Sequence, residues 1–327
     1  MRFAFTDDQI ALRDGFRQAL LRACPPDAVR AAWRGDRGEH WATLAELGAL
    51  GALLPESVGG LDLGLLDAVL LFEAAGEVAL PAPLVDSAAV AGPLLVGAGE
   101  LGLARALGVG EACVVATTAA QVAYPAQADA ALRLVDGGAF LLDLARAQVA
   151  VETMDQGRPV ATVDWAGARR LDVAPEAVSV AVDRGAVATA AVLVGLGKRL
   201  IDMTVEYVKL RHQFGKPIGA FQAVQHQIVD ALVNLEFARP LVYRAAHSLD
   251  VGDPDGSIHA SMAKSMASDA AYGVSRAALQ CHGAMGYSHE YDLHLWMKRV
   301  WALGREWGDA HHHRGRVADH LHLPKGV

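Results

Sequence analysis

The sequence predicts a mainly α-helical protein with one small β region in its middle. Three observations lead to this fold class. Of the 327 residues, 53% are hydrophobic and only 6% are aromatic. The abundant Ala, Leu, Val and Gly suit tightly packed helices better than a β-sandwich, which favours β-branched and aromatic residues. Apolar side chains recur at helical spacing in the first and last thirds, whereas the middle holds short β-prone runs.

The first segment, residues 1–110, is expected to form a helical domain. Apolar side chains repeat at helical spacing in two stretches, at Ile10, Leu12, Phe16 and Leu20 and then at Trp41, Leu44, Leu47, Leu50 and Leu53. A Gly-rich break over residues 55–63 interrupts this pattern. A further apolar helix then continues to about Gly76.

Residues 111–182 change character and predict a small β domain. Short β-prone runs at 114–118, 139–142 and 148–151 alternate with Gly and Asp turns. From residue 183 helical periodicity returns, with helices expected around 196–208, 221–235 and 257–282. We therefore expect residues 183–327 to form a C-terminal four-helix bundle.

Charge and cysteine content limit the possible partners and the location. A net charge of −8 argues against a nucleic-acid partner, which would require clustered Lys and Arg. Asp7 and Asp8 precede any apolar core of a signal peptide, so we expect a cytoplasmic protein that is not bound to a membrane. Cys24, Cys113 and Cys281 are far apart and form no C-x-x-C pattern, so they should be small buried side chains.

The most informative segment begins at Arg211 and reads RHQFGKPIGAFQ. It resembles the signature that opens the C-terminal domain of the acyl-CoA dehydrogenases, and the order helices, β region, helices is similar to that family over nearly the whole chain. FAD, the family's cofactor, needs a fixed cation for its pyrophosphate and an apolar wall for its adenine. The resemblance implies that the cofactor-binding residues here are Arg211, Gln213, Phe214, Phe221 and Gln222. The competing interpretation is a plain turn between helices with Phe214 in the core.

A second segment, from Gln280 to Tyr287, reads QCHGAMGY and resembles the family's Q-x-x-G-G-x-G-Y. The resemblance implies that Gln280, Gly283 and Ala284 also approach the cofactor, through backbone amides at a helix end. Ala284 replaces a glycine, and it can keep the amide contact if its φ is negative. An ordinary Gly-terminated helix is the alternative. In the family both motifs serve a flavin that is seated mainly in the neighbouring subunit.

The catalytic glutamate of the family is missing. Family members remove the α-proton of an acyl-CoA thioester with this carboxylate, whose pKa burial raises. Its two known positions correspond here to Trp307 and to Gly185, and neither can accept a proton. Glu306 adjoins Trp307, but a one-residue offset on a helix turns a side chain by roughly 100°, so we expect a surface charge. No residue of this chain is therefore assigned a catalytic role.

Two further features bear on the site. The family's T-E-P…G-S-D segment, which contacts the flavin ring, is absent between Val114 and Ala130, so the β domain is reduced. The run from His311 to His313, with His320 and His322, invites a metal interpretation, but adjacent histidines on a helix point in different directions. We expect a solvated or interface surface and no metal site. His282 lies within the second motif and His289 follows it, and both are expected to have supporting roles.

Retained cofactor motifs, a missing base and a reduced β domain together resemble the non-catalytic subunit of heterotetrameric (α2β2) actinobacterial steroid-CoA dehydrogenases. The resemblance implies α,β-desaturation of an acyl-CoA, FAD as cofactor, a homologous catalytic subunit as partner and an electron-transfer flavoprotein as electron acceptor. Two alternatives remain open. The chain could form a self-sufficient homo-oligomer, either a dehydrogenase using Glu306 or a flavin monooxygenase of the same fold. It could also be a flavin-free scaffold subunit.

Overall fold

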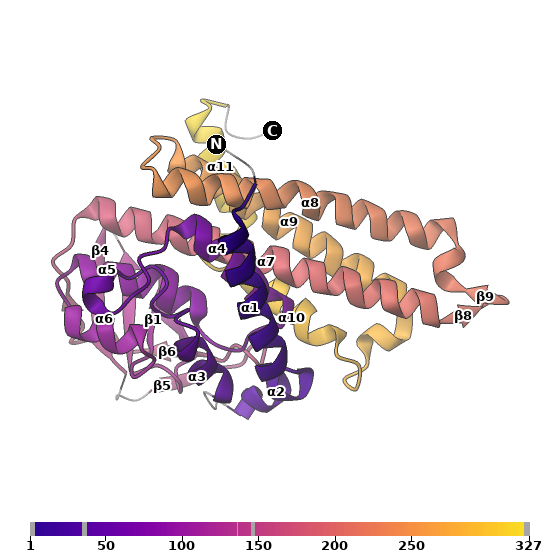
Figure 1. The fold of residues 1–327 in the computed structure, drawn as a ribbon, viewed down its shortest axis with the longest axis horizontal. Helices are drawn as coiled ribbons and strands as arrows, with labels where there is room; N and C mark the ends of the chain where they lie inside the picture. Colours follow the sequence, from indigo (N-terminus) through magenta and orange to yellow (C-terminus); the bar gives the residue numbers. More distant parts are fainter. Residues whose placement is uncertain (1–3, 35–37, 136, 145–147, 324–327) are drawn as a thin grey trace.

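The computed structural model describes residues 4–34, 38–135, 137–144 and 148–323 (Figure 1). A helical N-terminal part is followed by two small sheets and then by long helices, so the predicted fold class is confirmed. In Figure 1 the N-terminal helices and the strands lie together on the left, while the long helices extend to the right and end at a small hairpin. Residues 1–3, which begin the expected N-terminal domain, lie outside the described residues.

The N-terminal part contains α1 (Asp7–Ala23), α2 (Pro26–Ala31), η1 (Ala32–Arg34), α3 (Gly38–Glu46), η2 (Glu56–Val58), α4 (Leu65–Glu77), the π-helix η3 (Val85–Ala91), α5 (Gly92–Gly97) and α6 (Leu101–Gly108). Thr6 starts α1 through a capping box with Gln9. Two details of the predicted stripes are wrong. Ile10 and Leu12 are exposed, because α1 packs through Phe16 and Leu20. Helix α3 ends at Glu46, so the apolar residues after it lie in turns.

The β region forms two small sheets. The first has the order β1-β3-β4-β7 and contains β1 (Val114–Thr117), β3 (Ala130–Val135), β4 (Gly138–Asp143) and β7 (Arg169–Arg170). The second has the order β2-β6-β5 and contains β2 (Gln121–Ala123), β6 (Val160–Val163) and β5 (Gln148–Val151). Only β1 and β3 run parallel; the other pairs are antiparallel. Strands β1 and β2 are joined by three residues, 118–120, which leaves no room for a long flavin-binding segment.

The C-terminal part contains α7 (Pro175–Leu210), the hairpin strands β8 (His212–Gln213) and β9 (Lys216–Pro217), η4 (Ile218–Ala220), α8 (Gln222–Asp250), α9 (Gly256–His282), η5 (Gly283–Tyr287), α10 (Leu293–Leu303) and α11 (Ala310–His320). Helix α7 packs against α4, α8, α9 and α10. Among the described residues it is the one helix long and apolar enough to cross a membrane, but most of its apolar stretch is buried inside the protein. It is therefore the central core helix.

Helix α7 begins at Pro175, eight residues before the expected start of the last domain at 183. In the structure Asp183 is buried inside α7 and pairs with Arg316 of α11 at 3.0 Å. A buried carboxylate is tolerated there because a cation from another helix compensates it.

Close contacts tie the N-terminal part to the long helices. Glycines allow α4 and α7 to touch: a Cβ at Gly195 would lie 1.9 Å from the Glu73 carbonyl oxygen, and one at Gly76 would lie 2.1 Å from that of Val192. Asp250 of α8 accepts hydrogen bonds from the backbone N–H groups of Leu65 and Leu66 at 2.8 and 2.9 Å, which caps α4. The three cysteines are buried thiols, as predicted.

Candidate functional site

The first motif forms an exposed hairpin at the far end of the long helices. Gly215 and Phe214 have φ values of +80° and +53°, which turn the chain between β8 and β9. Phe214 is 92% exposed and meets Phe221 edge to face, with ring centroids 6.3 Å apart. This exposure excludes the interpretation that Phe214 fills the core. Gln213 and Gln222 are exposed beside it.

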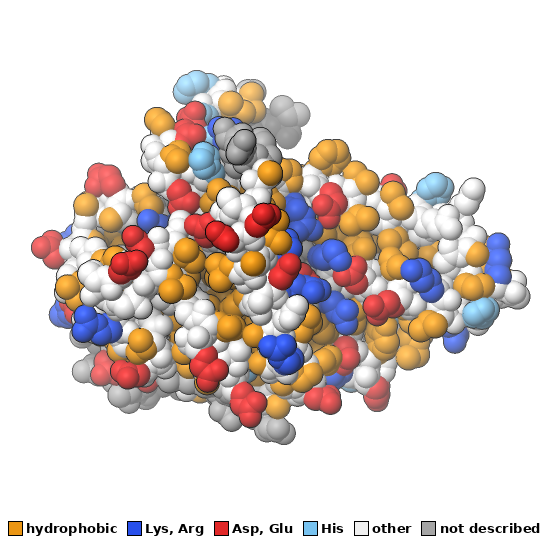
Figure 2. Space-filling model, in the orientation of Figure 1, with side chains coloured by type: hydrophobic (Ala, Val, Ile, Leu, Met, Phe, Trp, Pro, Cys, Tyr) orange, Lys and Arg blue, Asp and Glu red, His pale blue; other side chains and the backbone are white. Residues whose placement is uncertain are grey.

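Cations surround these aromatic rings. Arg211 is exposed at the end of α7, and Lys216 places its Nζ 4.3 Å from the centroid of the Phe221 ring. Blue side chains are visible at this end of the molecule in Figure 2. The hairpin thus combines positive charge with flat apolar surface, the two properties that a dinucleotide requires.

The second motif lies at the same end of the molecule. Tyr207, one turn before Arg211, stacks on His282 of α9 with ring centroids 4.3 Å apart. Its hydroxyl also donates to the His282 carbonyl oxygen at 3.4 Å. His282 is buried, which lowers the pKa of its imidazole, so its role is in packing. The end of α7 that precedes Arg211 therefore packs against the end of α9 that follows Gln280, although these two residues are 69 positions apart.

The turn after α9 suits a phosphate ligand. Gly283 has a φ of +57° and open space where a Cβ would stand. Ala284 is not among the described residues with positive φ, so an alanine adopts its backbone without strain. Gln280, Gly283 and Ala284 are exposed, and Tyr287 is 77% exposed. The residues at this end fit the adenosine and pyrophosphate half of FAD.

Trp307 and Gly185, the two positions that the resemblance assigns to the catalytic glutamate, come together in space. The Trp307 ring lies directly over Gly185 of α7, so that a Cβ at Gly185 would be only 2.5 Å from a ring carbon. Trp307 and Gly308 have φ values of +55° and +94°, which place the indole in this position. An uncharged ring therefore occupies the space beside both positions. A base of the usual kind cannot act there.

The loop from Gly304 to Asp309, which carries Trp307, is held in place by hydrogen bonds to its backbone carbonyl groups. Lys264, which is fully buried, donates from Nζ to the carbonyl oxygens of Gly304 and Gly308 at 3.1 and 3.0 Å. His313 approaches the Trp307 carbonyl oxygen at 2.9 Å. Burial lowers the pKa of Lys264 to about 8 and that of His313 to about 4. The backbone of the loop is thus fixed from two neighbouring helices.

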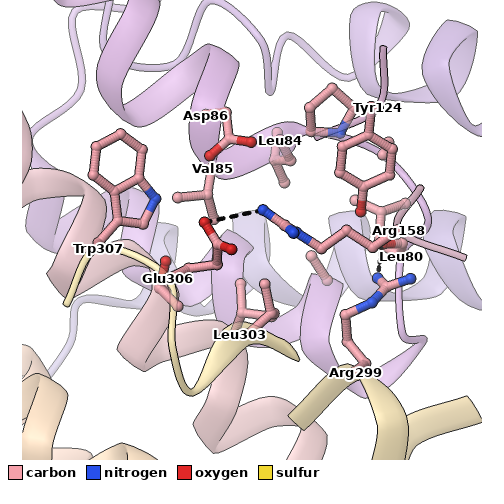
Figure 3. A pocket seen from close by; sticks show the side chains of 15 residues that line it. Leu80, Leu84, Val85, Asp86, Tyr124, Arg158, Arg299, Leu303, Glu306 and Trp307 are labelled. Atoms are coloured by element: carbon pink, nitrogen blue, oxygen red, sulfur yellow. Dashed lines mark hydrogen bonds and ion pairs between the residues drawn. The ribbon is translucent and has the colours of Figure 1, made fainter. Parts of the chain in front are cut away.

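A small cavity of about 40 Å³, here called the Asp86 chamber, lies beneath this loop (Figure 3). Its polar lining consists of Asp86, Tyr124, Arg158, Thr189, Arg299, Glu306 and the Trp307 indole. Asp86 accepts a hydrogen bond from Trp307, and burial raises the pKa of its carboxyl to about 7. The chamber has room for a few waters and is far too small for a flavin ring.

Sequence reasoning missed Asp86. The signal in the sequence was a single acid within the mostly apolar run from Leu84 to Ala91. In the structure, Val85–Ala91 forms a π-helix, a rare element that often marks functional sites. Tyr124, which also lines the chamber, has a φ of +53°. Strained and buried polar residues thus gather around this cavity.

Glu306 is not the surface charge that we expected. Its carboxylate lies 3.0 Å from Nη2 of Arg158, and the two side chains are 31% and 9% exposed. The loop turns Glu306 inward, because Trp307 has left-handed backbone instead of continuing a helix. Arg299 is paired separately, with Asp155.

The histidine run divides between surface and core. His311 and His312 are exposed, as expected, whereas His313 is fully buried and also contacts Ser261 Oγ at 3.1 Å. Both ring nitrogens of His313 are therefore engaged by the protein. Within the part of the chain that the structure describes, no three His, Cys, Asp or Glu side chains are placed to hold a metal ion.

Family models match both helical parts of the chain. The model described as acyl-CoA dehydrogenase, N-terminal domain, matches residues 6–105. The model described as acyl-CoA dehydrogenase, C-terminal domain, matches residues 176–322. The two matched segments flank the strands β1–β7 and together cover well over half of the sequence.

Curated relatives include two proteins named acyl-CoA dehydrogenase IpdE2. The one from Mycolicibacterium smegmatis is 31% identical, with 90% of this chain and 93% of that protein covered. The one from Mycobacterium tuberculosis is 29% identical, with 90% and 91% covered. Acyl-CoA dehydrogenase FadE34 of M. tuberculosis is 31% identical over 91% of this chain, which spans only 46% of that longer protein.

Solved structures share the fold over almost the whole chain. A variant of the Tcur3481–Tcur3483 steroid ACAD superposes with a TM-score of 0.88 at 25% identity, covering 97% of this chain and 98% of that one. The ChsE4–ChsE5 complex from M. tuberculosis gives a TM-score of 0.87 at 24% identity, with both chains fully covered.

Proposed function

This chain belongs to the acyl-CoA dehydrogenase family of FAD-dependent oxidoreductases, and we propose that within it the chain is the non-catalytic subunit of a heterotetramer. Its partner would be a homologous subunit that carries the glutamate base and seats most of the FAD. The chain would lend its hairpin and its second motif to that cofactor. The overall reaction would be α,β-desaturation of an acyl-CoA thioester.

The observation that carries this proposal is a contrast between two parts of the chain, the region around Trp307 and the end that carries the cofactor motifs. The Trp307 ring covers Gly185, so the positions of both family bases are filled without a proton acceptor. The two segments that resemble the cofactor motifs, in contrast, are retained with one substitution, at Ala284, and are exposed, with Phe214 92% exposed. Exposed aromatic side chains of this kind are costly unless a ligand or partner covers them.

The lent residues have distinct tasks in this arrangement. Bound FAD would supply the hydride acceptor for the desaturation. The Arg211 guanidinium would neutralise charge on the pyrophosphate, which removes part of the cost of burying it. Phe214 and Phe221 would form the apolar wall for the adenine. Gln280 would donate from its side-chain amide, and the small residues Gly283 and Ala284 would let the cofactor approach the turn closely.

The surface of α8 supports a large partner. Val229, Val233 and Phe237 are spaced four residues apart and exposed, so they form an apolar stripe along the helix. The stripe meets an apolar hollow of about 420 Å³ between α7 and α8, to which Val208, Ile228 and Val229 contribute. A helical subunit of the same fold would cover both features.

Names of the relatives support both the pairing and the substrate class. The Tcur3481–Tcur3483 protein is a steroid ACAD named for two chains, and FadE34 is about twice as long as this chain. We therefore propose a steroid side-chain CoA thioester as substrate. We also propose an electron-transfer flavoprotein as the electron acceptor and the cytoplasm as the location.

The test is to produce the chain alone and together with the acyl-CoA dehydrogenase-like protein encoded beside it, and to measure mass and flavin absorbance. The proposal predicts a colourless lone chain and a yellow heterotetramer with one FAD per pair. A yellow homo-oligomer with one FAD per chain would contradict it and favour the self-sufficient alternative. A colourless complex would favour a flavin-free scaffold.

Arg211→Ala in this chain then tests the lent site directly. We expect the complex to form but to lose most of its FAD, because the pyrophosphate loses its cation. Arg314→Ala, which removes another exposed arginine of the same helical part at α11, away from the hairpin (Figure 1), is the matched control and should keep its FAD. Equal FAD content in the two variants would contradict the assigned role of Arg211.

A further inference from the structure

An open groove of about 830 Å³ runs between the β region and the loop that carries Glu306. One wall is formed by residues 151–155 and Val160, the other by α9, α10 and the start of α11. Met154 and Tyr272 project into it with largely exposed side chains, and Trp301 lies beside them. Its size and apolar walls are those of a site for a small organic molecule.

The groove and the Asp86 chamber share a wall. Arg158 and Glu306 line both cavities, and their ion pair separates one from the other (Figure 3). Arg158 is nine-tenths buried, so its charge lies at the floor of the groove. Glu306 is more exposed and reaches the same point from the loop.

Most other charges on the groove are already compensated. Asp155 is paired with Arg299, and Asp269 is paired with Arg314 at 2.5 Å. Asp309 caps α11 by accepting from the His312 N–H at 2.8 Å. The Arg158–Glu306 pair differs, because a buried cation is matched there by a carboxylate that stands at the edge of solvent. For another molecule to reach the Arg158 guanidinium, only the Glu306 side chain would have to move, since Lys264 and His313 hold the loop backbone.

We propose that this groove binds a molecule with an apolar body and a terminal carboxylate, which replaces Glu306 on the Arg158 guanidinium. The exchange substitutes one carboxylate for another, so the charge at the floor of the groove is unchanged. The cost of burying Arg158 is already met by the fold, which makes the site preorganised. Glu306 would turn toward solvent, and the apolar body would lie against Met154, Tyr272 and Trp301.

Asp86 does not compete strongly for the same guanidinium. Burial raises the pKa of Asp86 to about 7, so its carboxyl is largely neutral below that pH. The binding itself concerns only this chain and needs no flavin, but in the assembled protein the inference rests on the proposed function. If FAD is seated mainly in the partner, the groove of this chain is left available.

The test is equilibrium binding to the full chain, measured by calorimetry at pH 6.5 with octanoate and with 1-octanol as probes. The two probes have the same apolar body and differ in the carboxylate. A charge-assisted hydrogen bond predicts about tenfold tighter binding of octanoate. Equal affinities, or no binding of octanoate at millimolar concentration, would overturn the proposal.

Variants separate the site from general binding to apolar surface. Glu306→Gln removes the competing charge, and octanoate should then bind about five- to tenfold more tightly. Arg158→Lys should weaken binding by at least tenfold, because lysine lacks the planar fork of donors. Arg305→Gln changes an exposed cation on the rim and should alter the affinity by less than twofold.

Glu306→Gln also keeps the test decisive if Arg158→Lys fails to fold. Unchanged or weaker octanoate binding by Glu306→Gln would overturn the exchange mechanism.

A carboxylate of this kind could belong to a free acid or to the distal end of an acyl-CoA. Comparing octanoyl-CoA with the mono-CoA thioester of octanedioic acid separates these sources, because only the second carries a distal carboxylate.

Discussion

At the scale of single residues, Trp307 has the largest consequence for function. Its indole lies against Gly185 and donates a hydrogen bond to Asp86. Its backbone carbonyl oxygen contacts His313. The Trp307 side chain thus stands at one of the two positions assigned to the base and fills the space beside the other, Gly185. It also lines the Asp86 chamber. An aromatic residue is tolerated there only because Gly185 has no side chain.

Gly185→Ala tests this packing. The added Cβ would stand 2.5 Å from the Trp307 ring, so we expect a loss of about 1–3 kcal/mol in the free energy of unfolding. Urea denaturation measures it. Gly273→Ala on α9 is the control, because open space surrounds that position and alanine there should stabilise the helix by about 0.5–1 kcal/mol. Similar effects of the two substitutions would show that the indole does not pack on Gly185.

Asp86 predicts a specific dependence of stability on pH. Because burial raises its pKa from 3.8 to about 7, the folded protein binds its proton more tightly than the unfolded chain does. This contribution is complete below pH 4 and is lost as the pH rises through 7. The stability of the wild type relative to Asp86→Asn should therefore fall by up to about 4 kcal/mol between pH 4 and pH 8.

Comparison with the variant is necessary, because His313 acts in the opposite direction. Burial lowers the pKa of His313 to about 4, so protonation of the unfolded chain reduces stability as the pH falls below 6.5. Urea midpoints of wild type and Asp86→Asn at several pH values isolate the contribution of Asp86. Parallel curves would contradict the raised pKa.

At the scale of elements, the position of α4 depends on residues far away in the sequence. Gly76 and Gly195 let it touch α7, and Asp250 of α8 caps its first turn. Tyr243 of α8 adds a hydrogen bond from its hydroxyl to Glu73 at 2.8 Å. These contacts join the N-terminal helices to the long helices that carry the cofactor motifs.

Asp250→Ala should weaken this junction. Two backbone N–H groups at the start of α4 lose their acceptor, and the helix dipole loses a nearby negative charge, so we expect a loss of about 1–2 kcal/mol. Thermal and urea unfolding would measure it. Asp230→Ala removes an exposed carboxylate of the same helix and should change stability by less than about 0.5 kcal/mol. An equal loss in both variants would argue against the cap.

At the scale of the whole molecule, the chain presents two incomplete surfaces. The hairpin end exposes Phe214 and Tyr287 beside cations, and α8 exposes its apolar stripe. A heterotetramer would cover both, which relates the exposed side chains to the missing base through one assembly.

Phe237→Glu tests the stripe as the contact with the partner. Phe237 is 64% exposed, so the substitution should leave the fold intact while placing a charge in the proposed interface. We expect co-purification with the partner to be lost, as measured by size-exclusion chromatography with light scattering. Asn234→Glu, at an exposed polar position of the same helix, should still assemble. Assembly of both variants would move the interface elsewhere.

Much of the site could be expected from local sequence. The segments around Arg211 and Gln280 are contiguous motifs at the ends of helices, and short-range turn chemistry at Gly215 and Gly283 shapes them. Glu306 and Asp86 could not be placed in this way. Glu306 depends on a left-handed residue at position 307, and Asp86 on burial by residues that lie far apart in the sequence.

By itself the sequence determined the fold class and the order of the three parts, because periodicity is a local property, and it predicted the cofactor motifs and the lack of the usual base. Only the tertiary structure decided that Trp307 covers Gly185, that Arg158 pairs with Glu306, and that a groove and a chamber share this pair as a wall. These features join residues more than one hundred positions apart. Their energies depend on burial and on close approach, which exist only once the chain has folded.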